Sequence, residues 1–196
     1  MNDHYFTNKP KTSHDVKTIE FTIRNQKLKF YTDAGVFSKQ RVDYGSEIML
    51  KALPPLEGQV LDLGCGYGAL GITLAKLNPQ AAITMVDINE RAVKLARRNM
   101  KLNNVDNAQS LISDGLSKVT GTYNYIISNP PIRAGKKVIY PWFEKSKDFL
   151  EPGGWLCLVI QKKQGAKSAM DKLQEVFGNC EALDKTGGFW IIRSIK

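Results

Sequence analysis

The chain has 196 residues, of which 42% are hydrophobic and 24% are charged, and this length and composition predict one folded domain with a short extension. No run approaches the roughly 18 consecutive apolar residues of a membrane span, and the polar N-terminal segment lacks the apolar region of a secretory signal. Three widely spaced cysteines, without a Cys-x-x-Cys pair, argue against a disulfide framework and against a zinc site. We therefore expect a metal-free protein of the reducing cytoplasm, with no membrane contact.

The net charge of +9 is confined to two parts of the sequence. Residues 1–41 carry 8 basic and 4 acidic side chains and residues 130–172 carry 9 and 4, whereas the rest of the chain is balanced at 11 and 11. Such clustering is expected of a surface that binds a polyanion. A solvated basic surface would give the same pattern, so the charge alone leaves both interpretations open.

The first elements predicted along the chain are a polar arm, a hairpin and a helix. Residues 1–18 predict a flexible arm. Residues 19–31 alternate between apolar and polar side chains around Asn25-Gln26, which is typical of a β-hairpin. Residues 43–53 have apolar side chains at helical spacing, and Pro54-Pro55 ends that helix. We expect these elements to lead into the main domain rather than to form a second one.

From residue 60 onward, strands and helices alternate. Strands are predicted at 60–63, 83–86, 108–112, 123–128, 155–160, 180–184 and 188–194. Helices are predicted from the glycine cluster 64–68 to about 77, at 90–102 behind an Asn89 cap, at 141–150 with an exit turn at 151–154, and at 165–177. This alternation predicts a parallel sheet with helices on both faces, and the closing hairpin makes the last strand antiparallel. The fold class is therefore a Rossmann-like, doubly wound α/β domain of seven strands over residues 19–196.

The glycine cluster lies where an α/β sheet binds nucleotide-like ligands. Gly64, Gly66 and Gly68 separate a predicted strand from a helix, and glycine lets the backbone turn tightly against a ligand. Asp87 ends the next strand, where a carboxylate can bind two ribose hydroxyls. The same glycines also satisfy the looser form of a dinucleotide loop, which would indicate an NAD-dependent oxidoreductase.

The carboxylate of Asp62 distinguishes these two ligands. Asp62 precedes the glycines at the end of the first core strand, where it would repel a pyrophosphate. It suits a ligand that carries an ammonium or a sulfonium group, and S-adenosylmethionine carries both. Asp114-Gly115 follows the third core strand, where it can face an adenine amino group or simply form a strand-exit turn. Cys65 is a small residue that fits the loop, with no base beside it.

The segment Asn129-Pro130-Pro131, directly after a predicted strand, is the most specific signal in the chain. Two prolines fix the backbone and remove donors, so that carbonyl groups face the cleft. The side-chain oxygen of Asn129 and the carbonyl of Pro130 can then accept hydrogen bonds from one planar –NH2 group. Such acceptors hold the amine and free its delocalised lone pair for attack, which is catalysis by positioning and electrostatics. The alternative is an ordinary strand-terminating turn.

With these residues assembled, the chain resembles the class I S-adenosylmethionine-dependent methyltransferases over residues 19–196. More narrowly, it resembles the family of guanine-N2 methyltransferases of small-subunit ribosomal RNA (type C), in a short single-domain form. The segments that carry this narrower resemblance are Gly35-Val-Phe-Ser38, Asp43-Tyr-Gly45-Ser46 and Asn129-Pro-Pro-Ile-Arg-Ala-Gly135.

The resemblance implies a role for each matching position. Phe37 and Ser38 would line the cofactor and target cleft. The cofactor would contact Asp62, Gly64 and Gly66 through its methionine part, Asp87 through its ribose and Asp114 through its adenine, with Cys65, Gly68, Ile88 and Gly115 completing its site. Asn129, Pro130 and Pro131 would bind the target amine. Many such enzymes have an aromatic residue after the two prolines, where this chain has Ile132; Phe37 is the ring that would replace it.

The predicted partner is ribosomal RNA or the small ribosomal subunit, bound by a monomer. Basic residues follow the predicted catalytic loop and the next strand, namely Arg133, Lys136, Lys137, Lys162 and Lys163. Positive charge would therefore surround the active site, and an unpaired base would reach it at less cost than a paired one. The alternatives left open are methylation of adenine N6 in nucleic acid or of a glutamine amide in protein, and a non-catalytic RNA-binding module.

Overall fold

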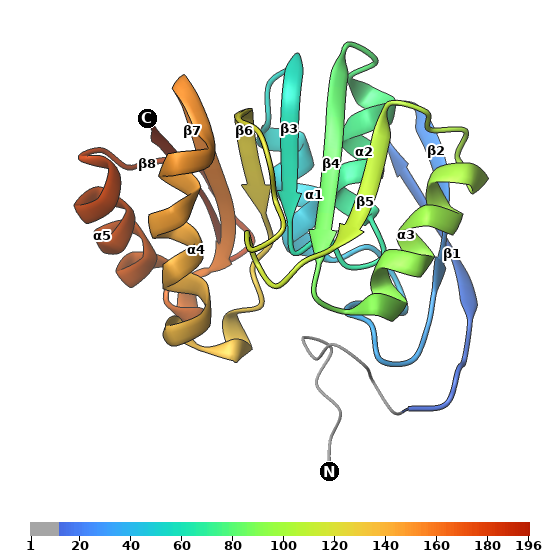
Figure 1. Ribbon diagram of the computed structural model, residues 1–196. Coiled ribbons are helices and arrows are strands. Elements are labelled where there is room, and N and C mark those ends of the chain that lie inside the picture. Colours follow the sequence, from blue (N-terminus) through green and yellow to red (C-terminus); the bar gives the residue numbers. More distant parts are fainter. Residues whose placement is uncertain (1–11) are drawn as a thin grey trace.

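The computed structural model describes residues 12–196, which form a seven-stranded sheet between two layers of helices and a separate two-stranded sheet (Figure 1). The strands are β1 (Lys17–Ile23), β2 (Gln26–Thr32), β3 (Gly58–Leu63), β4 (Ala81–Asp87), β5 (Ala108–Ile112), β6 (Tyr123–Ser128), β7 (Leu150–Gln161), β8 (Glu181–Thr186) and β9 (Phe189–Ile195). The α-helices are α1 (Tyr44–Ala52), α2 (Ala69–Leu77), α3 (Glu90–Leu102), α4 (Lys136–Phe149) and α5 (Ala166–Phe177). Two short 3-10 turns, η1 (Ile132–Ala134) and η2 (Lys162–Gln164), follow β6 and β7.

The strand order in the large sheet is β5-β4-β3-β6-β7-β9-β8. All neighbours are parallel except β9, which runs antiparallel to both β7 and β8. The predicted doubly wound fold with an antiparallel last strand is therefore confirmed. The chain order reverses between β3 and β6, and such a switch point opens a crevice at the carboxyl ends of the strands.

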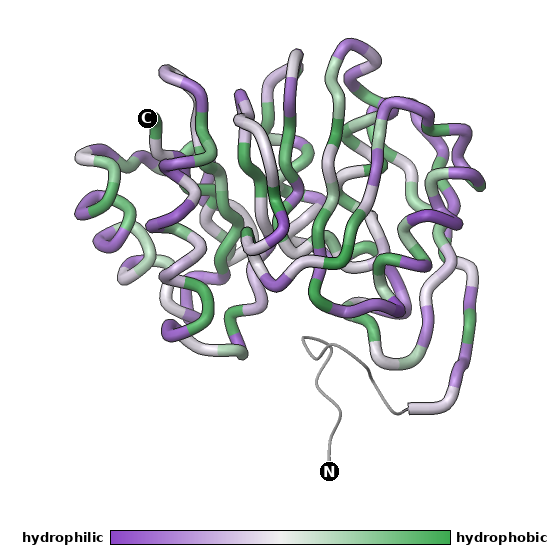
Figure 2. Tube along the Cα trace, viewed as in Figure 1, coloured by the Kyte–Doolittle hydropathy of each residue, from purple (hydrophilic) through white to green (hydrophobic). Residues whose placement is uncertain are grey.

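Alternate side chains of the central strands pack in two separate hydrophobic cores, one on each face of the sheet. Val60, Ile127 and Val159 pack in the core under α1, α2, α3 and the β1–β2 hairpin. Leu61 and Ile126 point to the opposite face, toward α4 and α5. Figure 2 shows hydrophobic colour along the strands, with hydrophilic stretches on the helices and turns. Because both faces of these strands are covered along their inner parts, the sequence has continuous apolar runs there rather than a simple alternation.

The β1–β2 hairpin is joined to the domain by two asparagines of α3. The buried Asn99 side chain accepts from the Tyr31 N–H (2.7 Å) and donates to the Tyr31 carbonyl (3.0 Å). Asn103 does the same for Lys29, at 3.0 and 2.7 Å. The side chains thus satisfy the free edge of β2, which would otherwise present unpaired backbone groups. The hairpin itself is as predicted, but it turns at Arg24-Asn25, both with positive φ, one residue earlier than expected.

Three predicted boundaries are corrected by the structure. The helix expected at 141–150 begins at Lys136, because Pro141 lies inside α4, where it removes only its own intrahelical hydrogen bond. The exit turn expected at 151–154 is part of β7, since the backbone of Gly153 and Gly154 pairs with Lys196. The arm predicted for 1–18 ends earlier, because β1 begins at Lys17, and residues 1–11 lie outside the described part of the chain.

Candidate active site

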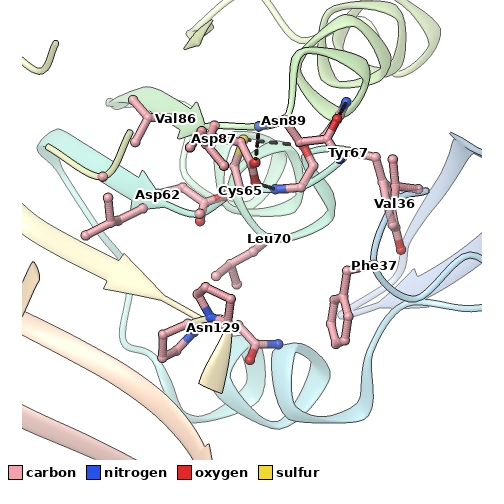
Figure 3. Close-up of a pocket in the computed structure, with 18 of the residues that line it drawn as sticks. Val36, Phe37, Asp62, Cys65, Tyr67, Leu70, Val86, Asp87, Asn89 and Asn129 are labelled. Atoms are coloured by element: carbon pink, nitrogen blue, oxygen red, sulfur yellow. Dashed lines mark hydrogen bonds between the residues drawn. The ribbon is translucent and has the colours of Figure 1, made fainter. Parts of the chain in front are cut away.

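A cavity of about 330 Å³ opens at the carboxyl ends of β3, β4, β5 and β6. The loop after β2 and the start of α4 complete its walls (Figure 3). Among its lining residues are thirteen predicted for the site: Phe37, Ser38, Asp62, Gly64, Cys65, Gly66, Asp87, Ile88, Asp114, Gly115, Asn129, Pro130 and Pro131. Residues far apart in the sequence therefore meet at one sheet edge, as the parallel topology requires.

The glycine loop folds back on the strand beside it. Gly64, Gly66 and Gly68 all have positive φ, a conformation that side-chain-bearing residues rarely adopt. The N–H groups of Gly64 and Cys65 both donate to the Val86 carbonyl, at 2.8 and 2.9 Å. Gly68 lies at the left-handed start of α2 and is not part of the cavity wall. The loop thus exposes its backbone to the cavity at Gly64 and Gly66.

Asp87 holds this loop in place and also faces the cavity. Its carboxylate accepts from the Gly66 N–H and the Asn89 N–H, both at 2.8 Å. Burial raises the pKa of Asp87, and these N–H groups oppose the rise. These backbone donors do not use every lone pair of the carboxylate, so a hydroxyl group of a ligand can still donate to it.

Asp62 is almost completely buried and has an unusually high pKa. Its Oδ2 accepts from the Gly71 N–H at 2.9 Å. Burial raises the pKa of Asp62 to about 7; the Gly71 N–H opposes this rise and the charge of Asp87 adds to it. When a buried carboxylate has no cation beside it, a positively charged ligand stabilises its ionised form. Burial likewise raises the pKa of the Cys65 thiol, so this residue is a poor nucleophile.

The charge of the cavity wall supports the same conclusion. Its acidic residues are Asp43, Asp62, Asp87 and Asp114, and no Lys, Arg or His is among its lining residues in the described chain. A dinucleotide would bring a pyrophosphate with two negative charges into this wall, without a basic residue to receive them. The cavity is therefore suited to a cationic ligand rather than to a pyrophosphate.

The amide of Asn129 is oriented by two residues at the start of α1. Its Nδ2 donates to Asp43 Oδ2 and to Ser46 Oγ, both at 2.9 Å. Asp43 also caps α1, because the same Oδ2 accepts from the Ser46 N–H at 3.2 Å. The nitrogen of the Asn129 amide is thus fully used, and its Oδ1 accepts no hydrogen bond from a residue in 12–196. That oxygen is the group available to a donor in the cavity.

The backbone after Asn129 forms a tight turn. The Pro130 carbonyl accepts from the Ile132 N–H at 2.8 Å, around Pro131 with φ −74° and ψ 74°, which is close to an inverse γ-turn. One lone pair of this carbonyl is therefore used inside the loop, in contrast to the fully free carbonyl that the sequence suggested. The Ser128 hydroxyl donates to the Leu63 carbonyl at 2.5 Å. This bond joins the end of β6 to the end of β3 and brings Asn129 beside the glycine loop.

Several residues predicted to bind the target do not line the cavity. Ile132 is half-buried and packs against the core under α4, so it is not placed to cover a base as expected. The exposed basic residues Arg133, Lys136, Lys137, Lys162 and Lys163 lie on η1, α4 and η2, outside the wall. They remain at the same edge of the sheet, since η1 and α4 follow β6 and η2 follows β7.

Other lining residues were not assigned to the site from sequence, among them Asp43, Ser46 and Trp142. Asp43 and Ser46 orient the Asn129 amide, and the only earlier signal was that they belong to a segment that carries the family resemblance. Trp142 was expected in the core or at an interface, but its ring covers Gly64 and Gly115: a Cβ on Gly115 would lie 2.5 Å from the indole nitrogen. Trp142 belongs to α4, whose first turns lie at the cavity.

Similarity to known proteins identifies the family of the chain. Residues 27–193 match the model of the methyltransferase small domain family. The chain belongs to this family. It is 44% identical to the Bacillus subtilis protein YbxB, described as uncharacterized, over the full length of both. The described residues contain no helix long and apolar enough to cross a membrane, and no group of three metal-ligating His, Cys, Asp or Glu side chains.

Relatives with an assigned activity are longer than this chain. The ribosomal RNA small subunit methyltransferase C of Aeromonas hydrophila is 41% identical over 64% of this chain and 37% of that protein. A solved T. thermophilus structure, described as a 16S rRNA N2 methyltransferase (RsmC) in complex with AdoMet and guanosine, superposes with a TM-score of 0.83 at 27% identity. It covers 95% of this chain and 52% of the other. The chain thus spans about half, or less, of these relatives.

Proposed function

We propose that this protein transfers a methyl group from S-adenosylmethionine to the exocyclic N2 amine of a guanine in ribosomal RNA of the small subunit. The observation that carries the proposal is the Asn129 amide, whose nitrogen is held by Asp43 and Ser46 and whose oxygen is left as an acceptor in the cavity. The protein acts as a monomer in the cytoplasm, where ribosomal RNA is its partner.

The residues of the cavity fit S-adenosylmethionine. This cofactor supplies an electrophilic methyl group on a positively charged sulfur. Asp62 receives the positive charges of the methionine part, and these charges favour the ionised form that burial disfavours. Asp87 accepts from the ribose hydroxyls, Ile88 and Gly115 contact the adenine, and Asp114 accepts from its amino group. The acidic wall that suits this ligand disfavours NAD, so an oxidoreductase is not supported.

The chain's own contribution to the chemistry is to hold the amine. Asn129 Oδ1 and the second lone pair of the Pro130 carbonyl accept the two hydrogens of a planar –NH2 group. These acceptors direct the nitrogen lone pair toward the methyl group, and they stabilise the positive charge that grows on nitrogen during transfer. No strong base is required at the start, because the proton becomes acidic as that charge develops. After transfer this proton passes to solvent water, because neither amide oxygen is basic enough to keep it.

Guanine in ribosomal RNA is the favoured target for two reasons. The family relatives named above are described as small-subunit ribosomal RNA methyltransferases, and one was solved with guanosine. The exposed basic residues beside the cavity suit a phosphate backbone. The same acceptors would also bind adenine N6 or a glutamine amide. The target is therefore identified by finding which nucleoside or amino acid carries the methyl group in the product.

A methyl-transfer assay with tritiated S-adenosylmethionine tests the proposal. The purified protein is incubated in parallel with undermethylated small subunits, naked 16S ribosomal RNA, tRNA and total ribosomal protein, and labelled RNA is digested to nucleosides. We expect label in N2-methylguanosine from the small-subunit RNA. An Asn129→Ala variant serves as the control for contaminating enzymes, because it should leave no label.

Each other outcome contradicts a defined part of the proposal. Label in N6-methyladenosine would keep the site chemistry and reject guanine. Label in ribosomal protein alone would reject RNA as the target class. If the protein bound S-adenosylhomocysteine but labelled none of these substrates, the proposed reaction itself would be wrong.

A further inference from the structure

The loop of residues 36–41, between β2 and α1, is anchored by a buried carboxylate. Asp33, only 1% exposed, accepts from the Asp15 N–H (2.6 Å), the Ala34 N–H (2.7 Å) and His14 Nδ1 (2.5 Å). Burial alone would raise the pKa of Asp33, but these hydrogen bonds hold it below its ordinary value. The start of the loop is therefore pinned to the segment that precedes β1.

Further hydrogen bonds fix the rest of the loop. Arg91 and Asn89, at the start of α3, donate to the carbonyls of Ala34 (2.6 Å) and Gly35 (2.9 Å). The buried Thr32 hydroxyl donates to the Lys39 carbonyl at 2.8 Å. Within the loop, the Ser38 hydroxyl donates to the Arg41 carbonyl at 2.6 Å, where Ser38 has the positive φ of 54°. The backbone of the loop is thus held from several directions.

Several side chains of this loop are nevertheless exposed, although Val36 is buried. Phe37 is 39% exposed, and Lys39 and Arg41 are exposed as well. Within residues 12–196, the ammonium of Lys39 and the guanidinium of Arg41 make no hydrogen bond or ion pair. Lys51, in the next helix, is by contrast paired with Glu47 at 2.5 Å. An exposed aromatic ring and two uncompensated cations, on a backbone held by hydrogen bonds, form a binding surface that loses little conformational entropy on contact.

We propose that the 36–41 loop binds the RNA around the target nucleotide: Phe37 stacks on the extruded base, and Lys39 and Arg41 bind the neighbouring phosphates. This inference rests on the proposed function and assigns its RNA-binding loop. Phe37 and Asn129 line the same cavity, and Figure 3 places both at its lower side, opposite Asp62 and Asp87.

The other aromatic residues of the wall are not available for this role. Tyr67 is only 3% exposed, and Trp142 packs over Gly64 and Gly115 near the predicted adenine end. Ile132 faces the core. Phe37 is therefore the one exposed ring among the described lining residues. On the other side of the cavity, Lys136 and Lys137 begin α4, so cations from two distant segments flank the same opening. A single RNA strand that crosses the opening would contact both.

Steady-state kinetics of the labelled methyl transfer test this inference, with the RNA substrate that the wild-type protein methylates. In the double variant Lys39→Ala/Arg41→Ala, we expect KM for RNA to rise about tenfold while kcat and the affinity for S-adenosylhomocysteine stay within twofold. The slope of log binding affinity against log salt should fall by about 1.4, as expected when two contacts to single-stranded phosphates are lost. The matched control is Lys27→Ala/Lys101→Ala, two exposed lysines at the far end of α3 and β2, which should leave both quantities unchanged.

Stacking by Phe37 is tested by a double-mutant cycle. The partners are Phe37→Ala and a single-stranded RNA oligonucleotide of about 12 residues in which the one guanosine is replaced by an abasic site. We expect each change alone to weaken RNA binding about tenfold or more. The two changes together should weaken RNA binding no more than either change alone. Independent, multiplicative losses would reject stacking on the base.

Failure of this inference can be distinguished from failure of the proposed function. If the Lys39→Ala/Arg41→Ala variant methylates RNA with the wild-type KM and salt dependence, the loop is not an RNA-binding element, although the enzyme remains an RNA methyltransferase. If the wild-type protein transfers no methyl group to RNA, both proposals are rejected together.

Discussion

Replacement of Asp62 by asparagine should stabilise the ligand-free protein and abolish cofactor binding. The carboxyl group has a pKa of about 7 in the fold and an ordinary value of 3.8, because burial disfavours its charge. At about 1.4 kcal/mol per pH unit, this difference corresponds to about 4 kcal/mol of unfavourable free energy when the group is fully ionised. Asparagine is nearly isosteric, and its side-chain oxygen can still accept from the Gly71 N–H.

The pH dependence follows from the direction of this shift. A carboxyl group with a raised pKa in the fold costs stability progressively as the pH rises from about 4 to about 7, and the full cost is present above that range. The asparagine side chain does not titrate. The free energy of unfolding of the Asp62→Asn variant, measured relative to that of the wild type, should therefore increase by about 3 kcal/mol between pH 5 and pH 8. Urea denaturation at both pH values measures this gain. Asp106→Asn, at an exposed aspartate, is the matched control and should show no such change.

The affinity for S-adenosylmethionine should increase with pH, whereas the contribution of Asp62 to stability decreases with pH. Since the ligand's positive charges favour ionised Asp62, wild-type affinity should fall about tenfold per pH unit below pH 7 and stay constant just above it. The Asp62→Asn variant should bind at least 100-fold more weakly, without this dependence. Calorimetry between pH 5.5 and 8 measures both. If wild type and variant showed parallel stability profiles and the same affinity, neither the raised pKa nor the role of Asp62 would stand.

Further predictions concern the amine site and the cofactor wall. Asn129→Ala should abolish turnover and leave S-adenosylmethionine affinity within a few-fold, because its oxygen acts on the target amine; normal turnover would remove Asn129 from that role. Ser46→Ala should lower kcat about tenfold through loss of one amide contact, with unchanged cofactor affinity by calorimetry, and an unaltered kcat would show that Asp43 alone suffices. Asp87→Ala should weaken cofactor binding at least tenfold; wild-type affinity would exclude it from the ribose site. Trp142→Phe should remove the change in tryptophan fluorescence on binding of S-adenosylhomocysteine, and a persisting change would place the ligand away from Trp142.

The order of strands and helices was predictable because it depends on local periodicity. Apolar runs, Asn89 as a helix cap and glycines between strand and helix are all features of short segments, and the structure has each of them. The errors occurred where a local rule competed with packing. A helix was expected at 141–150, yet α4 begins at Lys136 with Pro141 inside it, and it packs on β7 and α5. Gly153 and Gly154 favoured a turn, yet they pair with Lys196.

The sequence by itself determined the fold class and about half of the cavity's lining residues, because parallel strands bring their carboxyl ends to one edge whatever the details of packing. Only the tertiary structure decided how those residues are oriented. The Asn129 amide is set by Asp43 and Ser46, more than 80 residues away, and Trp142 reaches the cavity because of where α4 packs. Hydrogen-bond direction and side-chain contact depend on distances of a few ångströms between segments that are remote in the chain. Such distances exist only once the layers have assembled.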